Sequence, residues 1–178
     1  MFAFSCLLIV GCGEIIADPP TLTPEFNYHP YENEAAFDML YPTIWSFTLI
    51  QEGLLAFAES DALNLATEEL DASLVVFRDA DPVRFTLAED LQHYLDGGPL
   101  DAGFVQVENS TKVVIQGVES KSVVVVRDSA ENPAQAIIVM ARSRTGITYT
   151  FTATAPQYAW DFWWPHFQVM LSSVEFNE

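Results

Sequence analysis

Two unbroken apolar runs in the second half of the chain limit its fold most strongly. They are residues 123–126 (VVVV) and 136–141 (AIIVMA). Valine and isoleucine favour extended strands, and a strand that is apolar at every position must be covered on both of its faces. We therefore expect a sheet whose centre lies between two other layers.

Further strands are predicted by alternating apolar residues and by the turn residues between them. Phe37, Met39 and Tyr41 alternate ahead of Pro42, and this strand should continue into a three-stranded meander. The other predicted strands are residues 46–51, 54–58, a run from Ser73 to the Asp81-Pro82 step, 104–109, 112–116, 122–127, 134–142 and 147–155. Because short turns separate successive strands, the sheet should be antiparallel.

One covering helix is predicted between the early and late strands. Thr86 and Glu89 have the spacing of a capping box, which opens a helix that passes through Leu91 and Leu95 and ends at Gly97. Residues 60–71 are acidic and have a weak apolar face, so a loop or a short helix is expected there.

A second covering helix is predicted at the C-terminus, in residues 159–176. Its apolar residues recur at helical spacing, namely Trp160, Trp163, Trp164, Phe167, Met170, Leu171 and Val174. Because proline fits the first turn of a helix, the regular part is expected to start at Pro165, with residues 160–164 as a looser entry turn.

The N-terminus has the pattern of a lipoprotein signal. Residues 1–10 are apolar but too short to span a bilayer as a helix. The run closes on Ile9-Val10-Gly11-Cys12, which resembles a bacterial lipobox, although no basic residue precedes it. We predict that Cys12 is lipidated; the alternative is a buried N-terminal strand.

This pattern divides the chain into three parts. Residues 1–11 are expected to be a signal peptide, residues 12–34 a proline-bearing, lipid-anchored tether, and residues 35–178 a single domain. Acyl chains would then hold the domain to a bacterial cell membrane or envelope on its extracytoplasmic side. Cys6 would leave with the signal and Cys12 would carry lipid, so no disulfide is expected.

The charge of the chain excludes one large class of partners. The formal net charge is −18, and no Lys or Arg precedes Arg78. Such a chain repels phosphate backbones, so nucleic acid is not an expected partner. Two interpretations remain open: the acidity serves solubility, or it attracts a cationic partner or loosely held divalent ions.

Several short motifs follow the order of a known superfamily. They are residues 39–45 (MLYPTIW), a helix after the first strands, Gly117-Val118-Glu119 ahead of a valine-rich strand, and a closing pattern of Phe167, Met170, Leu171, Ser173 and Phe176. This order resembles the PsbP/Mog1-like superfamily over about residues 35–176. Each motif consists of packing residues.

The resemblance implies an α+β fold in which helices flank both faces of an antiparallel β-sheet, an α/β/α sandwich. It also implies a non-catalytic binding or assembly role. Plant members support the oxygen-evolving complex, the Mog1 branch binds a small GTPase, and bacterial members are often small lipoproteins. Neither specific activity is carried over, because no residues here match a GTPase-binding or manganese-cluster motif.

Sequence motifs for metal or cofactor binding are weak. His29, His93 and His166 lack the spacing of zinc ligands; we expect His93 to be solvated and His166 to lie at the rim of the aromatic face. Asp79 and Asp81 form half of a calcium motif without its glycine and distal glutamate, so solvated loop charges are the favoured interpretation. No cofactor is expected.

Exposed aromatic residues are the predicted contact points. On a continuous helix Tyr158 and Phe162 would point away from the apolar stripe, where they could meet a protein partner, a small apolar ligand or the membrane surface. The alternative is that the chain bends at Pro165 and buries them. The sequence contains no Gly-x-Ser-x-Gly motif and no glycine-rich phosphate loop, so catalysis is not expected.

The leading hypothesis is a lipid-anchored, extracytoplasmic module that binds a protein partner in the cell envelope. The alternative is a lipoprotein that holds a small apolar ligand or a cation between sheet and helix. A hydrolase is a third and less favoured hypothesis, since it needs a nucleophile beside an acid or base in a cleft.

Overall fold

A computed structural model describes residues 27–33, 36–59, 72–81, 83, 85–100, 102–107, 113, 115 and 117–177. Cys12, the signal region, most of the predicted tether and residues 60–71 lie outside the described residues. Two of the predicted strand segments, residues 104–109 and 112–116, are described only in part.

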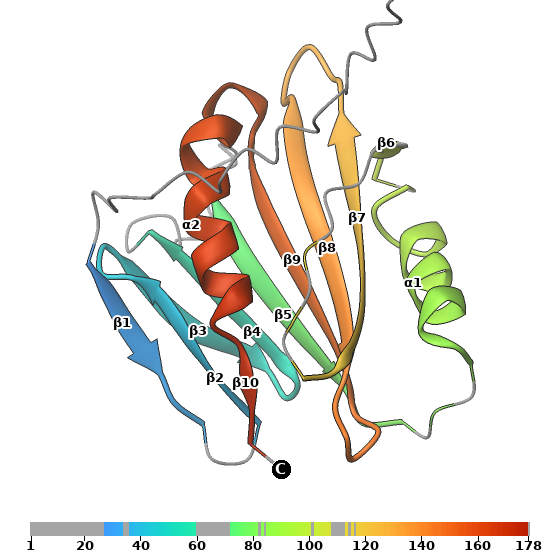
Figure 1. The fold of residues 1–178 in the computed structure, drawn as a ribbon. Helices are drawn as coiled ribbons and strands as arrows, with labels where there is room; N and C mark the ends of the chain where they lie inside the picture. Colours follow the sequence, from blue (N-terminus) through green and yellow to red (C-terminus); the bar gives the residue numbers. More distant parts are fainter. Residues whose placement is uncertain are drawn as a thin grey trace, which may run out of the picture.

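The centre of the fold is a seven-stranded antiparallel sheet in the order β3-β4-β5-β9-β8-β7-β6 (Figure 1). Its strands are β3 (Trp45–Gln51), β4 (Leu54–Glu59), β5 (Ser73–Asp79), β6 (Val105–Val107), β7 (Glu119–Arg127), β8 (Ala134–Arg142) and β9 (Thr148–Pro156). The antiparallel sheet and nearly all of its predicted strands are thus confirmed. Where residues 112–116 are described, at Val113 and Ile115, the chain is not in a strand.

A small second sheet corrects two expectations. It has the order β1-β2-β10, from β1 (Tyr28–Tyr31), β2 (Phe37–Pro42) and β10 (Glu175–Phe176). The predicted meander is therefore wrong, because β2 pairs with β1 and β10, whereas β3 joins the large sheet. The domain also starts earlier than Ala35, since β1 lies within the predicted tether.

Aromatic packing explains why β1 belongs to the fold. The ring of Tyr31 lies 5.3 Å from that of Phe37, 5.1 Å from Phe47 and 5.3 Å from Phe57. These three rings come from β2, β3 and β4, so Tyr31 joins the two sheets. A pattern of isolated aromatics among prolines does not reveal such a contact, because the partners are distant in sequence.

Helix α2 (Trp160–Ser172) and the small sheet cover one face of the large sheet (Figure 1). The helix starts at Trp160, not at Pro165, and it follows a 3-10 turn, Gln157–Ala159. Pro165 inside the helix gives up one backbone hydrogen bond. Burial of Trp160 and Trp163 in the main core compensates for this loss.

The C-terminal end of α2 is also shorter than expected. The helix ends at Ser172, and Phe176 pairs with Phe37 in the small sheet. Val174 is buried, as its position in the apolar stripe predicts, but it lies in the connection between α2 and β10. The chain leaves the helix because β2 offers backbone hydrogen bonds that a longer helix would leave unmade.

Helix α1 (Leu87–Asp96) covers part of the opposite face, with the predicted cap. The Thr86 side chain accepts a hydrogen bond from the Glu89 N–H at 3.3 Å, and the Thr86 N–H donates to the Glu89 carboxylate at 2.8 Å. Bonds from the Thr86 backbone and hydroxyl lower the pKa of Glu89. The ionised Glu89 side chain therefore stabilises the helix fully at a pH above the pKa that Glu89 has in the unfolded chain. This stabilisation is lost as the pH falls through the lowered pKa of the folded state.

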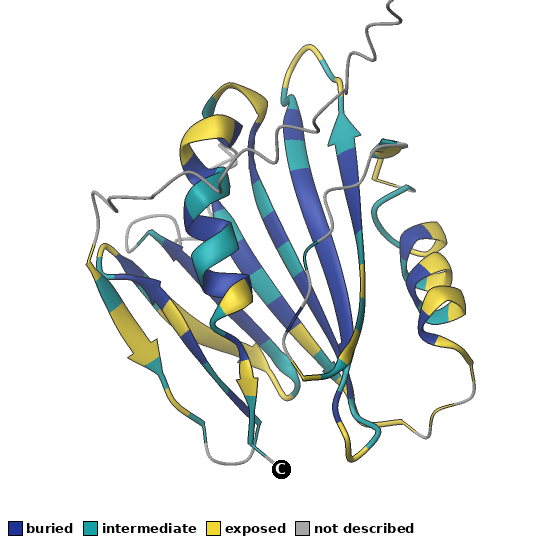
Figure 2. Cartoon of the chain, in the orientation of Figure 1, coloured by how far each residue is buried: buried dark blue, intermediate teal, exposed yellow. Residues whose placement is uncertain are grey.

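Within the described part of the chain, α1 covers only part of this second face. Leu87, Leu91 and Leu95 pack on β7 and β8 in a second apolar cluster. Among the described residues, that cluster contains no side chain of β3, β4 or β5. Figure 2 shows the consequence, since β8 is buried along most of its length whereas most of β3 is exposed. The described residues include no helix with the length and apolar character that crossing a membrane requires.

Replacing Thr86 by alanine tests the cap. We expect Thr86→Ala to lower the free energy of unfolding by about 1 kcal/mol, because an N–H at the helix start loses its acceptor. Urea denaturation followed by circular dichroism measures the change. Gln92→Ala, at an exposed position of the same helix, is the control and should change stability by less than about 0.5 kcal/mol. Equal effects would show that the cap has no special role.

Candidate binding pocket beside the first helix

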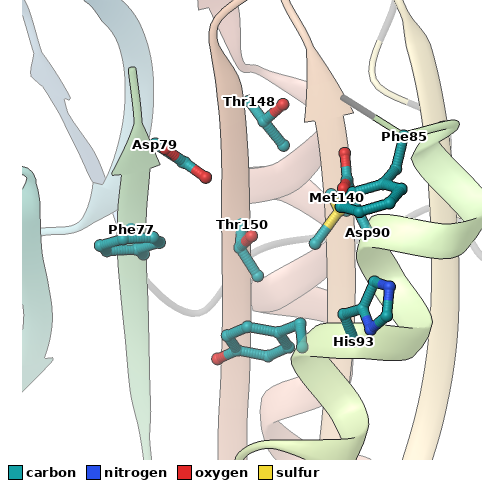
Figure 3. Close-up of a pocket in the computed structure, with 9 residues that line it drawn as sticks. Phe77, Asp79, Phe85, Asp90, His93, Met140, Thr148 and Thr150 are labelled. Carbon is teal, nitrogen blue, oxygen red and sulfur yellow. The ribbon is translucent and has the colours of Figure 1, made fainter. Parts of the chain in front are cut away.

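A pocket of about 430 Å³ lies where α1 stops covering the large sheet. Its walls come from β5, the segment before α1, α1 itself, β8 and β9. The lining residues are Phe77, Asp79, Phe85, Asp90, His93, Tyr94, Met140, Thr148 and Thr150. Figure 3 shows Phe77 and Asp79 on one side of this space and Phe85 and His93 on the other.

Aromatic side chains form much of the wall. Phe77 and Phe85 are both exposed at the pocket, although each is a large apolar residue. The ring of Phe85 lies 5.1 Å from that of His93. Tyr94 is held by a hydrogen bond of 3.1 Å between its hydroxyl and that of Thr152 on β9. These faces can bury an apolar group or lie against a cation.

Arg142 on β8 fixes the far wall in place. Its guanidinium donates to the carboxylate of Asp90 at 2.6 Å and to the backbone carbonyl of Phe85 at 3.3 Å. It also donates to the Thr148 hydroxyl at 3.4 Å. One side chain thus ties α1, the segment before it, and β9 together. The charge of Asp90 is neutralised within the protein.

Asp79 brings a second carboxylate to the pocket from the end of β5 (Figure 3). One of its oxygens accepts the Asp81 N–H at 2.9 Å, which shapes the turn after the strand. Asp81 is exposed and does not line the pocket. Of the two aspartates predicted as weak cation ligands, Asp79 lines the pocket and Asp81 does not. The described residues contain no group of three or more His, Cys, Asp or Glu suited to a metal ion.

The predicted contact residues lie elsewhere: Tyr158 is in the 3-10 turn before α2, and Phe162 is in the first turn of α2. Tyr158 is 88% exposed and Phe162 is 47% exposed. Their outward orientation is as predicted, and the helix does not bend to bury them. Because α2 covers the other face of the sheet, the fold does not bring these rings together with Asp79.

The three histidines have different environments. His29 and His93 are exposed, in β1 and α1. His166 is 7% exposed, so its predicted place at a rim is wrong. Its Nδ1 lies 2.7 Å from the Tyr28 hydroxyl, which is brought there by the unexpected strand β1. Burial raises the pKa of Tyr28.

The pocket is not predicted by the sequence motifs. Two local signals point to it: Phe77 and Asp79 alternate on β5, and Thr148 and Thr150 alternate on β9. The register pairs Phe77 with Thr150 and Asp79 with Thr148, which places all four on one face. The contribution of α1 could not be read from the sequence, because it depends on where the helix packs across the sheet.

Solved structures with the same fold come from several bacteria. LpqN of Mycobacterium tuberculosis, described as involved in cell envelope biogenesis, has a TM-score of 0.59 at 10% identity, over 87% of this chain and 93% of its own. Cyanobacterial PsbP (CyanoP) from Synechocystis has a TM-score of 0.58 at 16% identity, over 93% and 97%.

A Bacteroides thetaiotaomicron structure has a TM-score of 0.53 at 11% identity, over 83% of this chain and 47% of its own. This chain therefore spans about half of that protein's length. Neither a protein family nor a curated protein matches the sequence. These similarities confirm the PsbP/Mog1-like α+β fold that the resemblance implied.

Removing the partner of Arg142 tests the pocket wall. We expect Asp90→Ala to lower the free energy of unfolding by about 1–3 kcal/mol, because a largely buried guanidinium loses its charged acceptor. Thermal and urea unfolding measure the change. Asp96→Ala removes the same charge from an exposed position of α1 and should cost less than about 0.5 kcal/mol. An equal cost for both variants would contradict the role of the ion pair.

Proposed function

We propose that this protein is a lipid-anchored, extracytoplasmic module of a bacterial cell envelope that binds a partner without chemistry of its own. The open pocket beside α1 is the observation that carries the binding role, because exposed Phe77 and Phe85 surround a space of about 430 Å³. Aromatic side chains of this kind usually mark contact sites. The shared fold with LpqN, described as involved in envelope biogenesis, supports the location.

The start of the described chain supports a second contact region at the anchored end. Tyr28 opens β1 and bonds to His166 in α2, so the chain arrives from the N-terminus beside this helix. Exposed Phe162 lies in the first turn of the same helix, and exposed Tyr158 lies in the 3-10 turn before it. A partner near the membrane would meet these two rings, and amphipathic aromatics suit such a position.

A small ligand in the pocket is the second candidate function. Asp79 supplies a carboxylate, and Phe77, Phe85 and Tyr94 supply aromatic surfaces. Together they suit a small organic cation with an apolar body, since ring faces and a carboxylate both attract positive charge. A hydrolase remains the third and less favoured candidate function.

Lipid anchoring predicts a defined mature N-terminus. In a bacterial host we expect intact mass spectrometry to give a chain that begins at Cys12 and carries a diacylglyceryl group. Inhibiting the lipoprotein signal peptidase should leave the uncleaved form. Cys12→Ser should remove the lipid and release the domain from membranes, whereas Cys6→Ser should leave processing unchanged. A cytosolic chain that still begins at Met1 would overturn the anchored part of the proposal.

Ligand binding in the pocket predicts a preference for cations. We expect benzyltrimethylammonium to shift the NMR amide signals of the pocket residues, and benzoate to bind far more weakly. Asp79→Asn should weaken binding of the cation by about threefold to tenfold, because the carboxylate no longer attracts it. Asp81→Asn makes the same charge change outside the pocket and should leave affinity unchanged.

Two outcomes would remove this second candidate function. One is equal binding of benzoate and the cation, which would show that the pocket does not discriminate charge. The other is an equal loss in Asp79→Asn and Asp81→Asn, which would indicate a general electrostatic effect of the acidic chain.

A further inference from the structure

β3 forms an outer edge of the large sheet, and its side chains are unusually apolar for such a position. β3 pairs with β4, and the described residues supply no strand on its other side. Residues 47–51 are all exposed. They include Phe47 at 48%, Leu49 at 69% and Ile50 at 47% exposure. Among the described residues, this edge therefore combines backbone groups without a neighbouring strand and apolar side chains that are half-exposed or more.

The other sheet edges are protected in ways that β3 is not. β6 has three residues and β10 has two. β1 contains Pro30, which cannot donate a ladder hydrogen bond. β3 has seven residues and contains no proline and no charged side chain. Soluble proteins commonly shorten an edge or place charge or proline on it, so the exception at β3 points to an interface.

The sheet register shows what an added strand would cover. Leu49 pairs with Leu55, Leu55 with Val76, and Val76 with Phe151. These cross-strand partners form one apolar row, which is buried everywhere except at Leu49. Phe47 likewise ends a row that continues through Phe57 and Leu74. A strand alongside β3 would extend both rows and cover their ends.

The net charge favours one occupant of this edge. Each chain has a formal charge of −18, so a second copy would bring strong repulsion. The β3–β4 turn adds the exposed acidic residue Glu52 at the end of the strand. A partner with Lys or Arg among its apolar residues experiences attraction instead.

We propose that β3 is a docking edge for an extended, basic segment of a partner protein, which adds antiparallel or parallel to the sheet as a further strand. Backbone hydrogen bonds supply the affinity, and the side chains opposite Phe47 and Leu49 supply selectivity. The docking edge rests on the proposed binding role but uses neither the pocket nor the lipid anchor.

A short synthetic strand tests this docking edge. The probe is a capped peptide of about eight residues that alternates Val and Lys, a length typical of a strand. Its comparison peptide alternates Val and Glu. We expect the Lys peptide to slow hydrogen exchange of the β3 amides at residues 46–51, and the Glu peptide to leave them unchanged.

Two variants with the same charge change locate the binding. Leu49→Lys places a cation on the docking edge and should lower the affinity for the Lys peptide by at least about fivefold. Val105→Lys makes the change on the opposite edge, β6, and should leave affinity within about twofold. Both substituted positions are exposed, so both variants should keep the unfolding midpoint of the parent chain.

The proposal fails if the Lys peptide protects no β3 amide, if both peptides bind equally, or if both variants weaken binding alike. It also fails if sedimentation shows a dimer that Leu49→Lys dissociates, because the occupant would then be a second copy. Binding of benzyltrimethylammonium is measured on the same sample. If this cation binds but the Lys peptide does not, the docking edge fails while the pocket proposal stands.

Discussion

Burial of β8 and β9 on both faces is the constraint on which the remaining architecture depends. Ile137 and Phe151 are fully buried on the face that α2 and the small sheet cover, and Ile138 is fully buried under α1. Each square ångström of apolar surface removed from water contributes about 25 cal/mol, so neither cover can be lost without exposing a large apolar area. The two helices and the small sheet are therefore all needed to bury the two faces of the central strands.

The same constraint locates the functional surfaces, because they begin where the covering ends. Helix α1 packs mainly on β7 and β8, and the pocket lies at its boundary, between the helix and β5. Arg142 holds that boundary in place through Asp90. On the opposite face, the apolar rows of the described residues end on β3 at Phe47 and Leu49, which are 48% and 69% exposed. The limited width of α1 thus accounts for the pocket, whereas the docking edge lies where the rows of the opposite face end at β3.

On the other face, two sequence-distant segments complete the core. β1 packs Tyr31 among rings from β2, β3 and β4, and Tyr28 bonds to His166 in α2. Through these contacts the N-terminal end of the described chain is fixed beside the exposed aromatics of α2. If the proposed lipid holds this domain near a membrane, a partner there would meet this end of the domain.

The features that depend on neighbouring residues could be predicted from the sequence. The capping box of Thr86 and Glu89, the strand periods and the apolar stripe of α2 are local patterns, and each appears in the structure. Long-range packing sets the departure of β2 from the meander, the place of β1 in the fold, the burial of His166 and the approach of Asp79 to Phe85 across a pocket. Several of these features depend on partners that are far apart in the sequence, such as Tyr28 and His166, which are 138 residues apart. Periodicity assigns a residue to a face, but the free energy of packing the whole chain selects what covers that face.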